Sequence, residues 1–244
     1  MSDLTLVLTV HDEGTMAVVS ARSLLAARAV ATAAGLRSQV ILVTDRPTEA
    51  TRHALAPFVR EQAPRVIETD FGDQGQARNE AIKAAEGAYV AFLDGDDLWS
   101  HNWLVAAHAT CTADPGRVIA HPEINWFFEG RSGAMFPPDM RDADFDPALL
   151  RSLNVYDALC MAPLEAHRAL PFGTRDVKGG FAVEDWHFAC ETINAGYQHH
   201  VAPGTIIFKR DRPGSRNAEA RAHRVTIRET ALMRFDWSPP GKAG

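Results

Sequence analysis

The sequence predicts an α/β protein with one central, mostly parallel sheet that is covered by helices on both faces. Two observations predict this class. Strand-like and helix-like runs alternate through the first hundred residues, and the strand-like runs are almost continuously apolar. The composition allows such a fold, because 244 residues with 46% hydrophobic content can bury a sizeable core. We therefore expect a single compact domain made of two halves.

The first half supplies four strands separated by helices. We expect the strands at Leu4–Val10, Gln39–Thr44, Arg65–Thr69 and Ala88–Asp94. We expect the helices at Met16–Gly35, Thr48–Val59 and Gly75–Gly87, the first and the last being closed by glycine. In parallel sheets of this kind the ligand lies beyond the carboxyl ends of the strands, so the polar residues there are the first candidates for a site.

After the acidic residues that follow the fourth strand, the pattern is less regular. We expect helices at Asn102–Ala113, Val183–Gly196 and Ala218–Phe235, and strands at Arg117–Gly130 and Gly204–Arg210. The stretch 131–147 is rich in Gly, Pro and Asp and predicts a loop. His199 and His200 have no metal-ligand partner at helical spacing, and we interpret them as surface or structural residues. The chain divides into halves 1–116 and 117–237 and a frayed tail, 238–244.

Charge and cysteine content narrow the class of protein. A net charge of −6 and a pI near 5.9 argue against a nucleic-acid binder that relies on a general basic surface. The three cysteines, Cys111, Cys160 and Cys190, show no close pairing and indicate thiols in a reducing compartment. The apolar run near the amino terminus has a strand's length, and we expect no transmembrane segment. The sequence thus predicts a soluble, cytoplasmic protein.

Three carboxylates follow the fourth strand within four positions, namely Asp94, Asp96 and Asp97. Like charges this close raise one another's pKa values unless a positive charge lies among them. A divalent cation with oxygen ligands is the usual remedy, and Gly95 allows the backbone to approach a ligand closely. The alternative interpretation is a solvated turn with a helix cap.

Three segments, in this order and spacing, resemble the GT-A nucleotide-sugar glycosyltransferases and, within them, glycosyltransferase family 2. Asp73–Trp99 resembles the family's Gly-x-x-x-Ala-Arg-Asn helix with the following strand and Asp-x-Asp motif. Gly179–Tyr197 resembles the Glu-Asp helix that carries the catalytic base, and Phe208–Asn217 is similar to the basic loop over the diphosphate. The resemblance covers about residues 4–215 and implies a Rossmann-like GT-A fold, with a nucleotide-sugar-binding first half and an acceptor-binding second half.

The resemblance implies an enzyme that moves a sugar from a nucleotide-sugar, by family habit a UDP-sugar, to a hydroxyl of a carbohydrate or glycoconjugate, with inversion. Mg²⁺ or Mn²⁺ on Asp96, with Asp94 in support, would neutralise the leaving diphosphate. Asp185 would be the base that deprotonates the acceptor, with Glu184 beside it. Both carboxylates are also explained as helix N-terminal residues that the helix dipole stabilises.

The resemblance also places the donor and acceptor contacts. The expected nucleotide-binding residues are Thr9, Val10, His11, Glu13, Asp45, Arg78, Asp94, Gly95, Arg210 and Arg212. The expected acceptor-binding residues are Trp186 and Gly180. Two stretches depart from the family pattern. The first, Thr9–Glu13, has His11 where an aromatic ring is common. The second, Thr44–Pro47, has Thr-Asp-Arg-Pro in place of the usual Asp-Asp-Gly-Ser, which leaves the register of Asp45 open.

Two other function classes stay open at this point. A haloacid-dehalogenase-like phosphatase also carries an Asp-x-Asp after a strand, but it needs threonine where this chain has Leu98, and it needs the motif early in the chain. A non-catalytic nucleotide-sugar-binding module would keep the fold without the chemistry. The presence of both the Asp-Gly-Asp and the Glu-Asp pairs argues against the second class.

Overall fold

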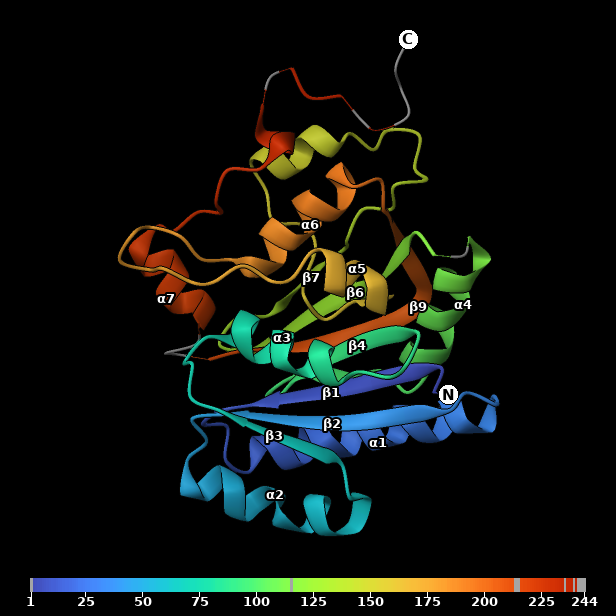
Figure 1. Ribbon diagram of the computed structural model, residues 1–244, viewed down its shortest axis with the longest axis vertical. Coiled ribbons are helices and arrows are strands. Elements are labelled where there is room, and N and C mark those ends of the chain that lie inside the picture. Colours follow the sequence, from blue (N-terminus) through green and yellow to red (C-terminus); the bar gives the residue numbers. More distant parts are fainter. Residues whose placement is uncertain (1, 115, 213–215, 235, 239, 241–244) are drawn as a thin grey trace.

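The computed structural model describes residues 2–114, 116–212, 216–234, 236–238 and 240 (Figure 1). Within these residues, nine strands form one sheet in the order β3-β2-β1-β4-β8-β6-β9-β5, and β7 pairs with β6. Figure 1 shows helices on both sides of this sheet, with α1 and α2 below the first strands and α3 above them. The predicted α/β class is confirmed.

The first half forms the parallel part of the sheet. Its strands are β1 (Leu4–Val10), β2 (Ser38–Asp45), β3 (Arg65–Thr69) and β4 (Tyr89–Asp94). Their crossovers contain α1 (Met16–Ala33), α2 (Glu49–Gln62) and α3 (Gln74–Ala84). Because β2 and β4 flank β1 and run parallel to it, the strand order reverses beside β1. Ligands of such sheets bind at this reversal, beyond the carboxyl ends of the strands.

The part of the chain after β4 is mixed in its strand pairing, with short antiparallel ladders beside a long parallel one. Its strands are β5 (Leu98–Trp99), β6 (Val118–Glu129), β7 (Gly133–Met135), β8 (Met161–Pro163) and β9 (Gln198–Asp211). Its helices are α4 (Trp103–Ala113), α5 (Leu164–Ala169), α6 (Glu184–Asn194) and α7 (Arg216–His223), with short 3₁₀ turns η1 (Pro147–Arg151) and η2 (Ala231–Met233). β8 lies antiparallel between β4 and β6, and β9 pairs in parallel with β6. One sheet therefore runs through both halves.

Helix α1 is long and apolar enough, by length and composition alone, to cross a membrane, which the sequence analysis did not expect. It packs against β1, β5, α2 and α4. Its buried residues are Ala17, Ser20, Ala21, Leu24, Ala27 and Ala31.

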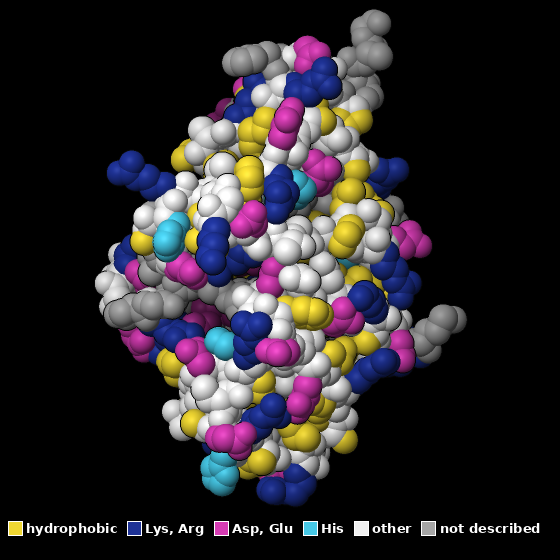
Figure 2. Space-filling model, turned by 60° about the vertical axis from the view of Figure 1, so that its left-hand side comes forward, with side chains coloured by type: hydrophobic (Ala, Val, Ile, Leu, Met, Phe, Trp, Pro, Cys, Tyr) yellow, Lys and Arg dark blue, Asp and Glu magenta, His cyan; other side chains and the backbone are white. Residues whose placement is uncertain are grey.

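On the face of the molecule seen in Figure 2, basic and acidic side chains are interspersed over the surface.

Two expected helix ends are wrong. The helix predicted at Ala218–Phe235 ends at His223, because Arg224 has a left-handed φ of 50° and the backbone of Thr226 bonds to Gly180 and Ala182 instead. Helix α3 ends at Ala84, before the glycine that was expected to close it. Gly87 instead lies against β1, where an added Cβ would come within 2.3 Å of the Leu4 carbonyl carbon.

His199 and His200 lie inside β9, so the structural interpretation is correct and the surface one is wrong. Tyr156 stacks on His199 and His121, with ring centroids 4.5 and 4.4 Å away. Thr192 of α6 donates to the Phe188 carbonyl and therefore accepts from His199 Nε2, 2.9 Å away. His199 Nδ1 is then left to accept from His121 Nε2, at 2.8 Å. This chain of hydrogen bonds ties α6 to β6 and β9.

Candidate active site

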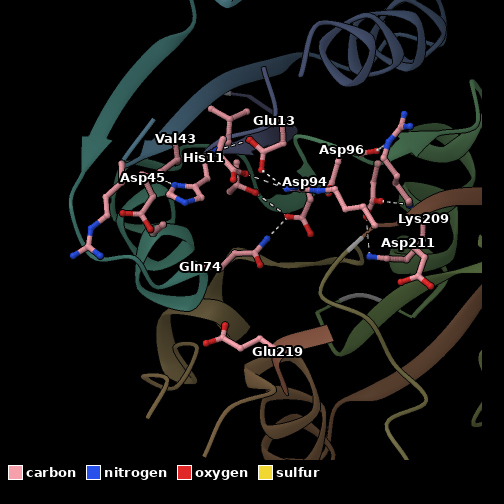
Figure 3. A pocket seen from close by; sticks show the side chains of 18 of the residues that line it. His11, Glu13, Val43, Asp45, Gln74, Asp94, Asp96, Lys209, Asp211 and Glu219 are labelled. Atoms are coloured by element: carbon pink, nitrogen blue, oxygen red, sulfur yellow. Dashed lines mark hydrogen bonds and ion pairs between the residues drawn. The ribbon is translucent and has the colours of Figure 1, made fainter. Parts of the chain in front are cut away.

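A polar cavity of about 430 Å³ opens at the carboxyl ends of β1, β2 and β4 (Figure 3). The end of β9 closes its other side with Lys209 and Asp211. Nine predicted site residues line this cavity: Thr9, Val10, His11, Glu13, Asp45, Asp94, Asp96, Arg210 and Arg212. The structure therefore brings together residues that lie up to two hundred positions apart in the chain.

Gly95 permits the tight fit of the Asp94–Asp97 turn against the end of β1. A Cβ at Gly95 would lie 2.9 Å from Val10 Cγ1 and 3.1 Å from both Glu13 Oε2 and the Thr9 carbonyl oxygen. Any larger residue would push the turn away from the cavity. This is the close backbone approach that the sequence predicted.

Asp94 is held by three donors. Its Oδ1 accepts from Thr9 Oγ1 at 2.8 Å, from Gln74 Nε2 at 2.6 Å and from Arg78 Nη2 at 2.8 Å. Burial alone would raise the pKa of Asp94, but the charges of Arg78 and Lys209 outweigh that effect and hold its pKa below the usual value. Asp94 is thus a fixed carboxylate whose hydrogen-bonding capacity is largely used by the protein.

Arg78 is not among the residues that line the cavity of about 430 Å³, but it lines a smaller cavity beside it. Arg78 is 2% exposed, and its guanidinium bridges Asp94 of the first half to Glu184 of the second, with a distance of 3.3 Å between Arg78 Nη1 and Glu184 Oε1. Burial disfavours its charge, but the two carboxylates outweigh this and raise the pKa of Arg78. Arg78 therefore joins the two halves, and its contact with a nucleotide stays a prediction.

Asp96 forms an ion pair with Arg212 of the same chain. Arg212 Nε donates to Asp96 Oδ2 at 3.0 Å, and Arg212 Nη2 lies 3.1 Å from Asp12 and 3.6 Å from Glu13. Burial, followed by the charge of Asp96, raises the pKa of Glu13, although a hydrogen bond from the His11 backbone opposes the shift. Pro213–Ser215 of the predicted basic loop lie outside the described residues.

Sequence reasoning missed Lys209 and Asp157. Lys209 is 8% exposed and pairs with Asp97 and Asp157, each at 2.9 Å from its Nζ. Burial and the neighbouring Asp96 and Asp94 raise the pKa of Asp97, whereas the two paired carboxylates keep Lys209 charged. A lysine within the apolar run of β9 was a usable signal. Asp157 lies in an irregular segment that gave none.

A second cavity of about 60 Å³ lies beside the first and shares Gln74, Asp94, Arg175 and Lys209 with it. Asp185, Glu184 and Asp157 complete its acidic wall. Burial, the charge of Glu184 and the charge of Asp157 raise the pKa of Asp185 to about 7. A carboxylate with a pKa near neutrality, beside a polar cavity, can accept a proton under ordinary conditions.

Asp45 and His11 form the far end of the larger cavity. Asp45 is 4% exposed and accepts from Thr69 Oγ1 and from the backbone N–H groups of Phe71, Gly72 and Asp73. His11 Nδ1 lies 2.5 Å from the Asp45 carbonyl oxygen. Asp45 therefore shapes the loop that leads into α3, and its contact with a nucleotide base stays a prediction.

The two expected acceptor residues lie outside both cavities. Trp186 packs with Leu150, Tyr156 and Ile193 in a second hydrophobic cluster, and its Nε1 donates to the Leu150 carbonyl oxygen at 2.7 Å. Gly180 has φ +86° and bonds through its backbone to Val177 and Thr226. Their role toward an acceptor stays a prediction.

The sequence matches known proteins over its first half. Residues 5–120 match the sequence profile described as "Glycosyl transferase family 2", and this span contains the cavity-lining strand ends and the Asp-Gly-Asp turn. The first half belongs to glycosyl transferase family 2. The match ends at residue 120.

Two curated relatives match over shorter stretches than the whole chain. "Uncharacterized protein y4gI" of Sinorhizobium fredii is 33% identical over 155 residues, which are 62% of this chain and 16% of that protein. "Putative teichuronic acid biosynthesis glycosyltransferase TuaG" of Bacillus subtilis is 37% identical over 68 residues, 27% of each chain. This chain thus spans well under two thirds of the curated relatives that it matches.

Solved structures extend the likeness of fold to most of this chain. The mannosyltransferase PcManGT of Pyrobaculum calidifontis, solved with GDP-Man and Mn²⁺, aligns with a TM-score of 0.65 at 16% identity, over 91% of this chain and 61% of that one. TarS of S. aureus, solved with UDP-GlcNAc, aligns with a TM-score of 0.62 at 18% identity, over 87% and 60%. At these identities the likeness concerns the fold alone.

Proposed function

We propose that this family 2 protein transfers a sugar from a nucleoside diphosphate sugar to an acceptor hydroxyl. The observation that carries the proposal is the pair of neighbouring cavities. The larger one has room for a nucleotide, and the smaller one presents Asp185 at its wall. Gln74, Asp94, Arg175 and Lys209 border both, so the bond to be broken would lie between them.

The donor's base and ribose would occupy the end of the larger cavity at His11 and Asp45, and the diphosphate would lie toward Asp96. Arg210, Arg212 and Lys209 lie at that end and offer cationic donors to phosphate oxygens. Arg212 now pairs with Asp96 and Asp12, so donor binding would exchange these partners for the diphosphate. A UDP donor is proposed from family habit, whereas the solved neighbours contain UDP-GlcNAc and GDP-Man.

The donor set at the turn fits a divalent cation only in part. Among the described residues, no group of three or more His, Cys, Asp or Glu could hold a metal ion. Mg²⁺ is commonly bound by one or two carboxylates together with substrate phosphates, and carboxylate oxygens also suit Mn²⁺. Asp96 faces the cavity and meets this need, whereas Asp94 is largely engaged by Thr9, Gln74 and Arg78. When bound, the cation would neutralise charge on the departing diphosphate.

Asp185 is the proposed base. Its raised pKa near 7 keeps a useful fraction ionised at neutral pH while it remains basic enough to accept the proton of an attacking hydroxyl. Glu184 is turned toward Arg78, so it orients that guanidinium and leaves the proton transfer to Asp185. We also propose inversion at the sugar carbon, from the family resemblance, and a cytoplasmic location, from the sequence composition.

A thermal-shift panel tests the donor. The purified chain is heated with Mn²⁺ and UDP-, dTDP- or GDP-sugars, and a ligand at 100 times its dissociation constant should add about 2.7 kcal/mol of stability. The family 2 match argues against the phosphatase alternative, and release of the nucleoside diphosphate from the best donor separates an enzyme from a binding module. If no nucleotide sugar shifts the melting temperature with or without Mn²⁺, the proposal is wrong.

A further inference from the structure

Asp185 uses its two oxygens unequally. Its Oδ1 accepts from the Trp186 backbone N–H at 2.7 Å and from Asn154 Nδ2 at 3.2 Å. Among the described residues no hydrogen bond to Oδ2 is present, and the carboxylate borders the smaller cavity. An ionised carboxylate is an acceptor only, so the Asn154 amide must present its NH₂ group to Oδ1.

The segment that carries Asn154 is anchored on the next three residues. The Tyr156 ring lies stacked on His121 and His199, and its hydroxyl donates to the Pro138 carbonyl at 3.0 Å. Asp157 is fixed by Lys209 and by the Leu159 backbone N–H at 2.8 Å. A donor on so constrained a segment is oriented in advance, which is what a group that orients a catalytic side chain requires.

We propose that Asn154 is a positioning residue, whose amide holds one oxygen of Asp185 so that the other faces the acceptor hydroxyl. The inference rests on the proposed transfer reaction, because it assigns the proton to Oδ2 of Asp185. The proton leaves the acceptor oxygen as that oxygen bonds to the sugar carbon, and the bond from this carbon to the diphosphate breaks. The Asn154 amide donates throughout and never takes part in the proton transfer.

The charged groups around Asp185 decide how the hydrogen bond affects its titration. Glu184 of α6 and Asp157 disfavour its ionised form, whereas Arg78 of α3 favours it. Asp94 of β4, Lys209 of β9 and Arg175 border the same cavity. A hydrogen bond to the ionised form also favours it, so its loss raises the pKa of Asp185 and moves the acid limb of the rate profile to higher pH.

The test compares Asn154→Ala, Asn154→Asp and Asn154→Ser with wild type, using release of the nucleoside diphosphate from the donor selected by the thermal-shift panel. We expect kcat of Asn154→Ala to fall about 10- to 100-fold, with the acid limb moved up by about one pH unit. KM and the calorimetric affinity for UDP with Mn²⁺ should stay unchanged. Asn154→Asp should lose more, because it places a like charge beside Asp185, and Asn154→Ser should recover part of the rate by keeping a donor.

Asn194→Ala is the matched control, because Asn194 lies at the other end of α6 and bonds Trp237 Nε1 through its side chain. It should keep the wild-type rate and acid limb. In an Asp185→Asn background, Asn154→Ala should cost nothing further, since the group that it orients is already inactive.

The outcomes separate this inference from the proposed function. A wild-type protein that binds no nucleoside diphosphate and releases none from any sugar nucleotide of the panel overturns both. Wild-type turnover, with an unchanged rate and acid limb in all three Asn154 variants, overturns the inference alone. The inference is also overturned if Asn154→Ala and the near-isosteric Asn154→Asp lose UDP affinity along with rate, because that pattern belongs to a structural residue.

Discussion

The two halves of the sheet position their site residues by different means. In the first half, Thr9, Asp45 and Asp94 lie at the carboxyl ends of parallel strands, where any protein of this class gathers its ligand contacts. In the second half, Asn154 and Asp157 come from an irregular segment before a three-residue strand. These two residues are placed by contacts between distant segments and by no regular rule. The following predictions test that contrast.

Replacement of Asp185 by Asn tests the second half and has the largest expected effect. If Asp185 is the base, turnover should fall by roughly 10² to 10⁴ while UDP affinity hardly changes. Kinetics of UDP release and calorimetry measure the two quantities. Turnover at the wild-type rate would move the catalytic assignment, with Glu184 as the next candidate.

The stability of Asp185→Asn separates the base from a helix cap. The folded-state pKa of Asp185 is about 7, above its ordinary 3.8, so the carboxyl group binds its proton more tightly in the folded chain than in the unfolded chain. Its ionisation therefore removes stability progressively as pH rises from near 4 to near 7. Asp185→Asn should be more stable than wild type at pH 8, whereas loss of a cap would cost about 0.5–2 kcal/mol. Urea unfolding of the variant and of wild type near pH 4 and at pH 8 distinguishes a base from a helix cap.

Arg78→Met tests the link between the halves. The change leaves the carboxylates of Asp94 and Glu184 without their shared partner and should cost about 3–5 kcal/mol of unfolding free energy, because both are largely buried. Urea titration measures it. Arg52→Met, which removes an exposed guanidinium paired with Glu68, is the control and should change stability little. Equal stability of the two variants would contradict the bridging role.

Asp96→Ala tests the first half. The variant should lose the metal dependence of nucleotide binding, and the affinity for UDP with Mn²⁺ should fall by more than about 100-fold, beyond the usual cost of losing an outer-shell partner. Asp94→Ala should weaken binding less directly, through the turn. Calorimetry with and without Mn²⁺ provides the measurement, and Asp144→Ala, an exposed change, is the control. Unchanged metal dependence in Asp96→Ala removes it as the ligand.

Arg212→Gln has the smallest expected effect and tests the contact between the end of β9 and the first half. The guanidinium now competes for Asp96, so its loss should strengthen the binding of Mn²⁺ alone by about two- to fivefold, the value of a partly exposed ion pair. UDP binding should weaken, because a cationic donor to the diphosphate is lost. Manganese titration by electron paramagnetic resonance checks the first change. Mn²⁺ affinity at or below the wild-type value would contradict the exchange.

The sequence by itself determined the parallel half and the ends of its strands. Near-continuous apolar runs separated by helices specify parallel pairing through local periodicity, and the Asp-Gly-Asp turn needs only its own glycine and the end of β1. The predicted strand at Arg65–Thr69 is confirmed to the residue. The helix carrying Glu184 and Asp185 was predicted from its own pattern as well, because its apolar face repeats at helical spacing.

Only the tertiary structure decided what these residues face. From the sequence, Arg78 was expected at the surface or against the nucleotide. It is instead buried and pairs with Glu184, 106 residues away, because the start of α6 lies against α3. The ion pair between Lys209 and Asp157 and the hydrogen bond between Asn154 and Asp185 also join residues that lie far apart in the sequence. Side-chain partners at such separations are set by how distant segments pack together, and the local sequence pattern does not encode that packing. Periodicity is local, whereas charge pairing in a core is not.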